Sequence, residues 1–337
     1  MPRIGRHPLK QKSIKQDPIR PSNITITTIV YIPSMTGYWS ESFDVLKLFF
    51  KSLVNNTNED YDLMVFDNGS CDEVIEYLSS LKNKGLIQYL ILSEKNFKKL
   101  GALNYLLQSA PGKIISYADS DIYFLKGWLQ ESLKILDTFP EAAKVTAIPI
   151  AGGDTTQISN KFYKSAIKDS TICVKTGKII EDKFINAHMV SIEKSLAQFN
   201  HEHNDRNDTL IERNNTKAYI STADFQFTIR KKSLINILPL LIEKDEDYYD
   251  PIYSPILERK LDDMGWWQLS TEDYLIHHMG NRIPNFSNEL NWLNKEDIES
   301  LYNKKIKKKN KVVRIKNRIL RGYLQKINIY IYKLLYE

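Results

Sequence analysis

The sequence predicts an α/β protein with a doubly wound, mostly parallel sheet, helices on both sheet faces and a basic helical C-terminal tail. Short apolar runs of strand character alternate four times with segments of helical periodicity between residues 24 and 136. The connections are long enough for right-handed crossovers between parallel strands. Polar residues follow several of these runs, so they are expected to meet at one edge of the sheet.

The expected elements follow in chain order. Strands are expected at residues 24–32, 61–67, 87–92, 113–118 and 143–150, and helices at residues 41–54, from Ser70 or Asp72 onward, at 98–109 and at 128–136. Residues 151–220 are polar and weakly patterned, so a long loop is expected there. The remaining expectations are a strand and a helix within residues 221–242, a helix near residues 253–263 and extended chain over residues 265–281.

The length of 337 residues exceeds that of a usual single domain. The composition, with 42% hydrophobic and 26% charged residues, is that of a globular protein and excludes fibrous and disordered classes. We expect a flexible basic arm at residues 1–22, one domain made of two halves (residues 23–150 and 151–284), and a basic helical tail over residues 285–337.

The net charge of +6 is concentrated at the two ends of the chain. Residues 303–337 hold twelve Lys and Arg against Glu337 alone, and residues 1–20 hold six against Asp17. The ends therefore carry +11 and +5, and the residues between them carry −10. An acidic body argues against nucleic acid as a partner, and the tails are interpreted as surface-binding appendages. No apolar run reaches the ~20 residues of a membrane span, and the N-terminus lacks the apolar centre of a signal peptide.

Neither the cysteines nor a histidine cluster has zinc-type spacing. Cys71 and Cys173 lie far apart in the chain, which favours a reducing compartment and hence a cytoplasmic location. His201, His203 and Asp205 lack the His-Glu-x-x-His helix spacing and any apolar flank, so they are interpreted as part of a solvated loop.

Two aspartates, Asp119 and Asp121, end the apolar run of the fourth expected strand in KIISYADSDIYF. Side chains two apart in extended chain point the same way, and ligands of open α/β sheets lie beyond the carboxyl ends of the strands. Mg²⁺ and Mn²⁺ prefer carboxylate oxygens, so the spacing predicts a divalent-cation site. The same spacing at residues 60–62 precedes a strand and at 245–247 lies in an acidic cluster, so both are interpreted as solvated charge.

The second expected strand ends in Asp67, within the turn sequence Asp-Asn-Gly. Its carboxylate is placed to accept from a nucleobase N–H or a ribose hydroxyl, although this turn is favourable without any ligand. No Gly-x-Gly-x-x-Gly follows the first strand and no Walker A loop is present. Classical dinucleotide oxidoreductases and P-loop NTPases are therefore excluded.

The ordered set VFDNGS, SEKN-x4-GALN and a strand ending in DSD resembles the donor-binding half of the inverting glycosyltransferase family 2, which has the GT-A fold. The resemblance covers residues 24–150 well and residues 218–282 more loosely. It implies a nucleotide-sugar-binding half at 23–150 and an acceptor-side half at 151–284. It implies that a nucleotide diphosphate sugar is bound by Pro33, Ser34, Asp67, Asn96, Gly101, Asn104 and Asp119, and that Mn²⁺ or Mg²⁺ is held by Asp119, Asp121 and His278.

The residues of the acceptor-side half match the family pattern less closely. Strand alternation puts His277 and His278 on opposite faces, so only His278 is expected to reach the site. The family's general base is usually an acid just before a helix in this half. We take Asp250 as the base, and the alternative is that it belongs to a solvated acidic turn. Asp247 also precedes the expected helix. Residues 272–273 have the sequence Glu-Asp, but they lie in the expected strand before His278.

The resemblance therefore implies a metal-dependent transfer of a sugar to an acceptor hydroxyl with inversion, in a role such as bacterial surface glycan synthesis. A sugar-phosphate nucleotidyltransferase is the enzymatic alternative, and a nucleotide-sugar-binding protein without a base is the non-enzymatic one. Trp266 and Trp267 could stack on a sugar, but at least one of two adjacent aromatic residues in a strand is expected in the core.

The C-terminal tail has the pattern of an amphipathic helix over residues 319–335, after a cationic run over residues 304–316. Apolar area and attraction to anionic lipid are the two ingredients of interfacial binding, so peripheral association with a membrane and a lipid-linked glycan acceptor are expected. The alternative is that the tail packs on its own domain or on a second subunit. Gly322 weakens either helical interpretation.

Overall fold

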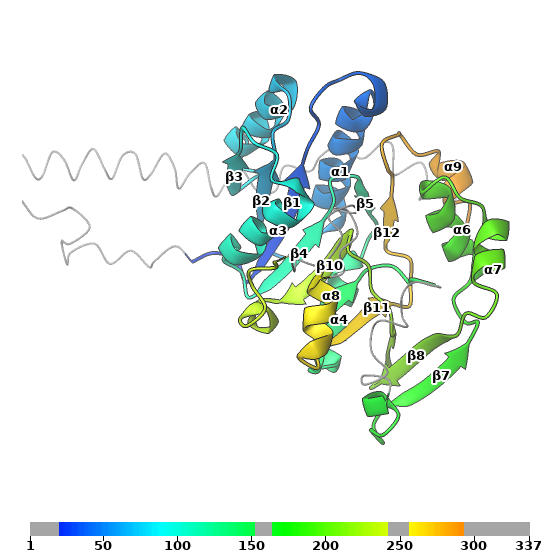
Figure 1. Cartoon of the computed structure of the whole chain (residues 1–337). Helices are drawn as coiled ribbons and strands as arrows, with labels where there is room; N and C mark the ends of the chain where they lie inside the picture. Colours follow the sequence, from blue (N-terminus) through cyan, green and yellow to red (C-terminus); the bar gives the residue numbers. More distant parts are fainter. Residues whose placement is uncertain (1–19, 152–163, 242–255, 293–337) are drawn as a thin grey trace, which may run out of the picture.

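The computed structural model describes residues 20–151, 164–241 and 256–292. Within them, a ten-stranded sheet has the order β3-β2-β1-β4-β10-β6-β11-β9-β8-β7 (Figure 1). Its strands are β1 (Ile24–Val30), β2 (Tyr61–Asp67), β3 (Tyr89–Leu92), β4 (Ile114–Ala118), β6 (Ala142–Thr146), β7 (Cys173–Gly177), β8 (Asp208–Arg213), β9 (Thr216–Tyr219), β10 (Gln226–Arg230) and β11 (Trp267–Thr271). A separate two-stranded sheet pairs β5 (Ile122–Phe124) with β12 (Ile276–His278).

The strands β1 to β4 are all parallel, as the alternation of strands and helices predicts. β1 pairs with β2 along its whole length and with β4 on its other side, and β2 pairs with β3. Parallel pairing brings the carboxyl ends of these four strands to one edge. Because β10, β9 and β7 run opposite to the others, the complete sheet is mixed but mostly parallel in direction. The predicted fold class is confirmed.

Helices cover both faces of the sheet. α1 (Ser42–Asn56), α2 (Asp72–Asn83) and α4 (Trp128–Thr138) pack on one face, and α3 (Lys98–Ser109) and α8 (Ile256–Asp263) on the other (Figure 1). β2 shows why its sequence is a continuous apolar run. Leu63 and Val65 pack among side chains of α1 and α2, whereas Met64 and Phe66 pack against α3. A strand that is buried on both faces cannot alternate apolar and polar residues.

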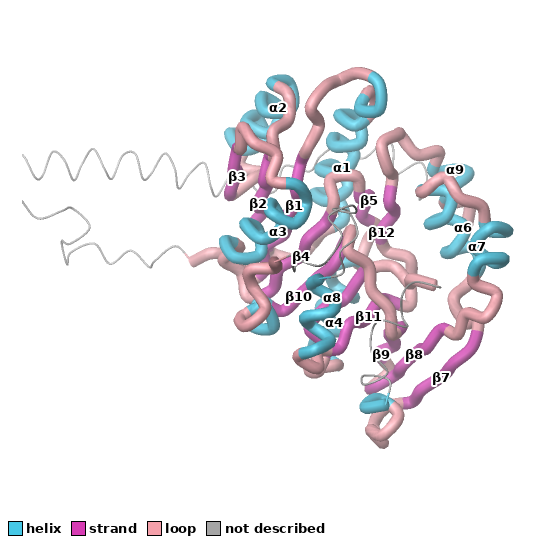
Figure 2. The backbone as a smooth tube through the Cα atoms, in the orientation of Figure 1, coloured by secondary structure: helices cyan, strands magenta, loops and turns pink. Residues whose placement is uncertain are grey.

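The expectation of one long loop over residues 151–220 is wrong for the described residues 164–220. They contain β7, α6 (Asp182–Ser191), α7 (Leu196–Glu202) and the pair β8 and β9, which extend the sheet by antiparallel pairing (Figure 2). The side chains of β7 are exposed or half-buried. An edge strand of this kind lacks the apolar run by which a buried strand is recognised in a sequence.

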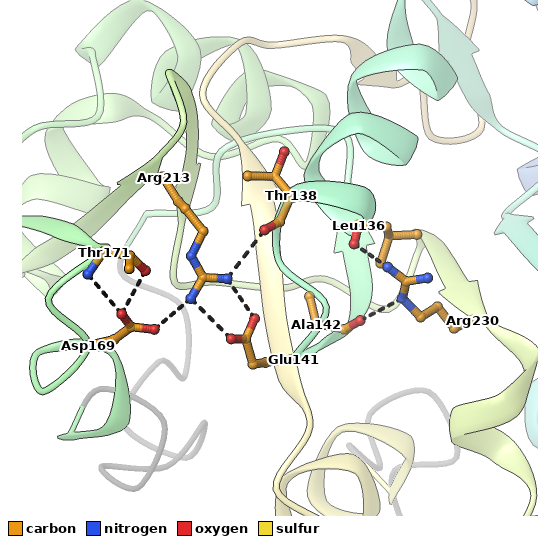
Figure 3. A network of polar contacts seen from close by, with 8 residues as sticks. All are labelled: Leu136, Thr138, Glu141, Ala142, Asp169, Thr171, Arg213 and Arg230. Atoms are coloured by element: carbon orange, nitrogen blue, oxygen red, sulfur yellow. Dashed lines mark hydrogen bonds and ion pairs between the residues drawn. The ribbon is translucent and has the colours of Figure 1, made fainter.

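Arg213, at the end of β8, ties this extension to the rest of the domain (Figure 3). Its guanidinium donates to both carboxylate oxygens of Glu141, at 2.9 and 3.0 Å, to Asp169 Oδ2 at 2.7 Å and to the carbonyl of Thr138 at 3.3 Å. Asp169 Oδ1 in turn accepts from the backbone N–H and the hydroxyl of Thr171. The planar fork of arginine suits this bidentate contact, which fixes the β8 end against the α4–β6 connection.

Two local expectations differ from the structure. α2 begins after Cys71, which occupies the N-cap position in place of Ser70 or Asp72; the Ser70 hydroxyl instead accepts from the backbone N–H of Ile32 at 3.0 Å. In the described residues 231–241, which follow β10, the helical structure is a short 3-10 helix, η3 (Lys231–Leu234). Pro239 lacks an N–H and its ring clashes with a preceding helical turn, so the chain cannot continue as an α-helix there.

No described helix is both long enough and apolar enough to cross a lipid bilayer. The predicted basic arm, at residues 1–22, and the basic tail, at residues 285–337, lie largely outside the described residues, which begin at Arg20 and end at Trp292.

Candidate active site

The site forms where β4 ends and the small β5–β12 sheet begins. Asp119 follows β4 directly, and its N–H donates to the carbonyl of Phe225 at 2.8 Å. Asp121 precedes β5, and its carbonyl accepts from the N–H of Met279 at 2.8 Å. Antiparallel pairing places His278 opposite Ile122. The backbone of three distant segments thus brings Asp119, Asp121 and His278 together, as the sequence predicts.

Asp121 and His278 form an ion pair. His278 Nε2 lies 3.3 Å from Asp121 Oδ2. Burial alone would lower the pKa of His278, but the Asp121 carboxylate outweighs it and raises that pKa. Burial alone would raise the pKa of Asp121, but His278 outweighs it and lowers that pKa. Asp121 Oδ1 and His278 Nδ1 are both buried without a hydrogen-bond partner among the described residues. Buried polar atoms normally have a hydrogen-bond partner, so these two atoms are available to bind a ligand.

Asp119 is held differently, by a lysine that the sequence analysis did not single out. Lys99 Nζ lies 3.0 Å from Asp119 Oδ2 and 3.0 Å from Asp224 Oδ2, and the Tyr117 hydroxyl donates to Asp119 Oδ1. Burial would lower the pKa of Lys99, but the two carboxylates outweigh it and raise that pKa. Burial raises the pKa of Asp119, with Asp121 and Asp224 adding to the rise and Lys99 opposing it. Three carboxylates therefore share one lysine and one histidine.

The donor set fits a hard divalent cation through Asp121 and His278. The unpartnered Asp121 Oδ1 is the type of ligand such a cation prefers, and imidazole nitrogen binds Mn²⁺ as well. No group of three or more His, Cys, Asp or Glu side chains in the described part of the chain has the geometry to hold a metal by itself. Mg²⁺ is usually held in proteins by one or two carboxylates and completed by substrate phosphates.

Asp67 lies at the same edge of the sheet, at the end of β2, and is fully buried. Its Oδ2 accepts from the N–H groups of Gly69 and Ser70, both at 3.3 Å, so the carboxylate shapes the turn. Gly69 has a φ of +92°, which favours glycine at this position. Asp67 Oδ1 has no partner among the described residues. Turn formation thus uses one oxygen of this carboxylate and leaves the other available to a ligand.

Three predicted donor-binding residues lie just before α3 or within it. Asn96 Oδ1 accepts from Asn68 Nδ2 at 3.1 Å and from the N–H of Lys98 at 2.7 Å, so its side chain shapes the turn into the helix. A Cβ on Gly101 would lie 3.0 Å from the Cβ of Phe97, so Phe97 would have to shift to admit a side chain. Asn104 exchanges two hydrogen bonds with the backbone of Leu240, at 2.7 and 2.8 Å. Pro33 and Ser34 follow β1 at the same edge, Pro33 exposed and Ser34 half-buried.

His277 points into the core, on the opposite face from His278, as strand alternation predicts. It is fully buried, with Nδ1 2.9 Å from the Tyr274 hydroxyl and Nε2 2.9 Å from Glu289 Oε2. The two tryptophans also pack in cores, Trp267 beside Phe139 and Trp266 on the α8 side. Sugar stacking by either is therefore not supported.

The candidate bases are only partly described. Asp250 and Asp247 lie outside the described residues. Residues 272–273 lie in the turn between β11 and β12, and Glu272 pairs with Lys217 at 3.0 Å. His201 belongs to α7 and is exposed, which agrees with its interpretation as solvated.

His188, on α6, is a site residue that sequence reasoning missed. Its ring stacks on Phe225 at 5.5 Å, and Phe225 lies 5.7 Å from the His278 ring. Burial, with smaller contributions from His278 and His277, lowers the pKa of His188 to about 3, so its imidazole is neutral. Lys99 lies within the pattern SEKN-x4-GALN and could have been found there. Nothing near His188 or Asp224 in the sequence marks them, because both reach the site through long-range packing.

Residues 29–204 match the model of the family described as glycosyl transferase family 2. The chain belongs to this family. Family membership agrees with the resemblance inferred from VFDNGS, SEKN-x4-GALN and DSD. Over 87 residues, or 26% of this chain, the family member is 30% identical to an uncharacterized glycosyltransferase of Rickettsia bellii (strain RML369-C) and to one of Rickettsia conorii (strain ATCC VR-613 / Malish 7). The matched segments are 12% and 14% of those longer proteins.

Solved structures with similar backbones include mannosyltransferase PcManGT from Pyrobaculum calidifontis in complex with GDP-Man and Mn²⁺. That structure has 12% sequence identity and a TM-score of 0.44, and the match covers 77% of this chain and 57% of the other. Another is S. aureus TarS 1-349, with 13% identity, a TM-score of 0.40 and coverage of 76% and 60%.

Proposed function

We propose that this family 2 protein transfers a sugar from a nucleotide diphosphate sugar to an acceptor hydroxyl, with a divalent cation. The single observation that supports this most is the Asp121–His278 pair beside Asp119, at the carboxyl edge of β4, with Asp121 Oδ1 left without a partner in the described residues. The PcManGT complex contains GDP-Man and Mn²⁺, which are the classes of donor and metal proposed for this chain.

In this proposal the nucleoside lies over the ends of β1 and β2. Asp67 Oδ1, which is buried and unpartnered among the described residues, accepts a hydrogen bond from the nucleobase or the ribose. Pro33 and Ser34 line the same pocket. The turn built by Asn96, together with Gly101, lets the start of α3 approach the diphosphate closely. Asn104 acts indirectly, because its amide fixes α3 to the Leu240 segment.

Asp121 and His278 would hold the cation, with Asp119 beside them. When bound, Mn²⁺ or Mg²⁺ would neutralise charge that builds on the leaving diphosphate. The ammonium group of Lys99 lies at the edge where the diphosphate would leave, so it would neutralise part of the same charge. On donor binding, Lys99 moves from a carboxylate toward a phosphate oxygen, which also frees Asp119.

The reaction breaks the bond between the sugar anomeric carbon and the diphosphate oxygen and forms one from that carbon to the acceptor oxygen. A carboxylate base takes the acceptor proton, and the nucleoside diphosphate leaves. We propose Asp250 as this base and inversion as the stereochemical outcome. The neutral His188 ring lies on the acceptor side and is placed to hydrogen-bond the acceptor hydroxyl without competing for its proton.

The test is a panel of nucleotide diphosphate sugars with Mn²⁺, scored for release of nucleoside diphosphate. We expect one donor to be hydrolysed slowly without acceptor, and chelation of the metal to stop the release. A matched variant, Asp263→Asn, changes an exposed aspartate of α8 and should leave the rate unchanged. Binding of a donor without any turnover would favour the non-catalytic alternative. Pyrophosphate release from a nucleoside triphosphate would favour the nucleotidyltransferase.

We further propose that residues 303–337 attach the enzyme to an anionic membrane surface, where a lipid-linked glycan would serve as acceptor in surface glycan synthesis. The support is the charge of this segment, since each basic residue near an anionic surface is worth about 1 kcal/mol. Full-length protein should co-sediment with phosphatidylserine vesicles at low salt, and a chain ending at Tyr302 should not. Equal sedimentation of both proteins would refute this attachment.

A further inference from the structure

The elements β7, α6, α7 and β8 meet at one end of the sheet, away from the aspartates (Figure 1). A cavity lies among the segments that join them. Its volume is about 550 Å³, within the range of small-molecule sites in proteins. The polar side chains that line it are Lys178, Glu181, Asp182, Asn200, Asn204 and Arg206. None of them was assigned a role by the resemblance or by the site described above.

Arg206 is the buried part of this lining. Its side chain is only 6% exposed, and its Nη2 donates to the carbonyl of Ile180 at 3.1 Å. Nε and Nη1 are buried and have no hydrogen-bond partner among the described residues. The nearest carboxylates, Asp208 at 3.7 Å from Nε and Asp182 at 3.9 Å from Nη2, lie beyond hydrogen-bond distance. Burying a guanidinium N–H without a hydrogen-bond partner is costly, so a ligand oxygen that accepts from Nε or Nη1 would be stabilised.

The rim of the cavity decides which ligand fits. Lys178 is basic, whereas Glu181 and Asp182 are acidic and exposed. A phosphate or carboxylate would be repelled by these two acids, but a hydroxyl group can donate to them and accept from Arg206. Asn200 and Asn204 are exposed, and each amide offers both donors and acceptors. No side chain caps the first turn of α6, where the N–H of Phe184 donates to the carbonyl of Glu181 at 3.0 Å.

We propose that this cavity binds a neutral, hydroxyl-rich sugar unit of the acceptor. The proposal rests on the proposed function, because it names the acceptor class of the same enzyme. α6 links the two places. Asp182 begins this helix at the cavity, and His188 lies six residues later beside Phe225 and His278, ~9 Å along the helix axis. An oligosaccharide can therefore occupy the cavity while a neighbouring unit presents its hydroxyl near His188.

The test is binding of full-length protein to an array of neutral and acidic oligosaccharides, followed by calorimetric titration with the neutral glycan that binds best. The double variant N200A/N204A should weaken this binding by ~25-fold, about fivefold for each lost amide. Arg206→Lys keeps the charge but loses the fork, and should also weaken binding by ~10-fold. The matched control is Asn83→Ala, an exposed asparagine at the end of α2, which should bind as the wild type does.

Donor hydrolysis with Mn²⁺ is measured in parallel and should stay within twofold of wild type in N200A/N204A. Wild-type protein that hydrolyses donor but binds no neutral glycan, or only acidic ones, would refute the sugar site and leave the proposed function intact. Unchanged glycan binding in N200A/N204A would refute the location. If the wild-type protein hydrolyses no donor but binds a neutral glycan, and N200A/N204A removes that binding, the proposed transferase activity is refuted and the sugar site is retained.

Discussion

Glu289 is the strongest candidate for an acid-sensitive group in the described domain. Its Oε1 accepts from Arg282 at 2.7 Å and from the N–H of Asn285 at 2.9 Å, and its Oε2 accepts from His277 Nε2. Burial would raise the pKa of Glu289, but these partners outweigh it, His277 first, and lower it to about 2. Burial lowers the pKa of His277, so this ring is neutral and donates through Nε2 while Nδ1 accepts from Tyr274.

The contribution of Glu289 to folding stability at each pH follows from the difference between its folded and unfolded pKa values. A folded-state pKa below the unfolded value means that the ionised carboxylate stabilises the fold above the unfolded pKa. This stability is lost as the pH falls through the folded pKa. With an ordinary value of 4.5 and a folded value of about 2, Glu289 contributes ~3 kcal/mol at pH 7, of which ~2 kcal/mol is lost by pH 3.

Glu289→Gln should lower the free energy of unfolding by ~3 kcal/mol at pH 7 and by less at pH 3, so the pH dependence flattens. Urea denaturation followed by circular dichroism at several pH values measures this. Glu94→Gln, at an exposed position, is the matched control and should follow the wild-type curve. A Glu289→Gln protein whose stability keeps the full wild-type slope between pH 5 and pH 3 would refute the assignment of acid sensitivity to this carboxylate.

Three further predictions concern the site and its support. Asp121→Asn should lower Mn²⁺-dependent donor hydrolysis by at least ~100-fold with no loss of folding, because it removes a ligand charge at nearly constant volume; wild-type turnover would contradict the metal assignment. His278→Ala should weaken Mn²⁺ affinity, measured by titration, more than His277→Ala does, and equal affinities would refute the choice between them. Arg213→Lys should lower the free energy of unfolding by ~1–2 kcal/mol in urea denaturation, since a lysine cannot span Glu141 and the Asp169 loop at once; unchanged stability would show that this network contributes little.

The first half of the domain was predictable because its signals are local. β1 to β4 and the helices between them bury one or both faces, so their apolar periodicity shows in the sequence, and their bounds differ from expectation by a few residues. Parallel pairing then gives the strand ends a common edge. Asp67, Asp119 and Asp121 follow directly, since a residue just after a strand cannot be far from that edge.

The second half was less predictable because its elements are exposed or are defined by distant partners. β7 lacks a buried face, α6 and α7 are short, and β12 has only three residues. Their formation depends on surfaces that other segments supply. The same holds for His277, whose role as a core residue depends on Glu289, twelve residues away on another element.

The sequence by itself determined the α/β class, the parallel direction of the first strands, the family resemblance and the placement of the aspartates. Only the tertiary structure decided that β10 inserts antiparallel between β4 and β6, which brings Asp224 to Lys99 across 125 positions of the chain. It also decided that α6 lies against β12, which brings His188 beside Phe225 and His278. The physical reason is that periodicity records which face of a segment is buried, whereas the identity of the segment that buries it depends on long-range packing.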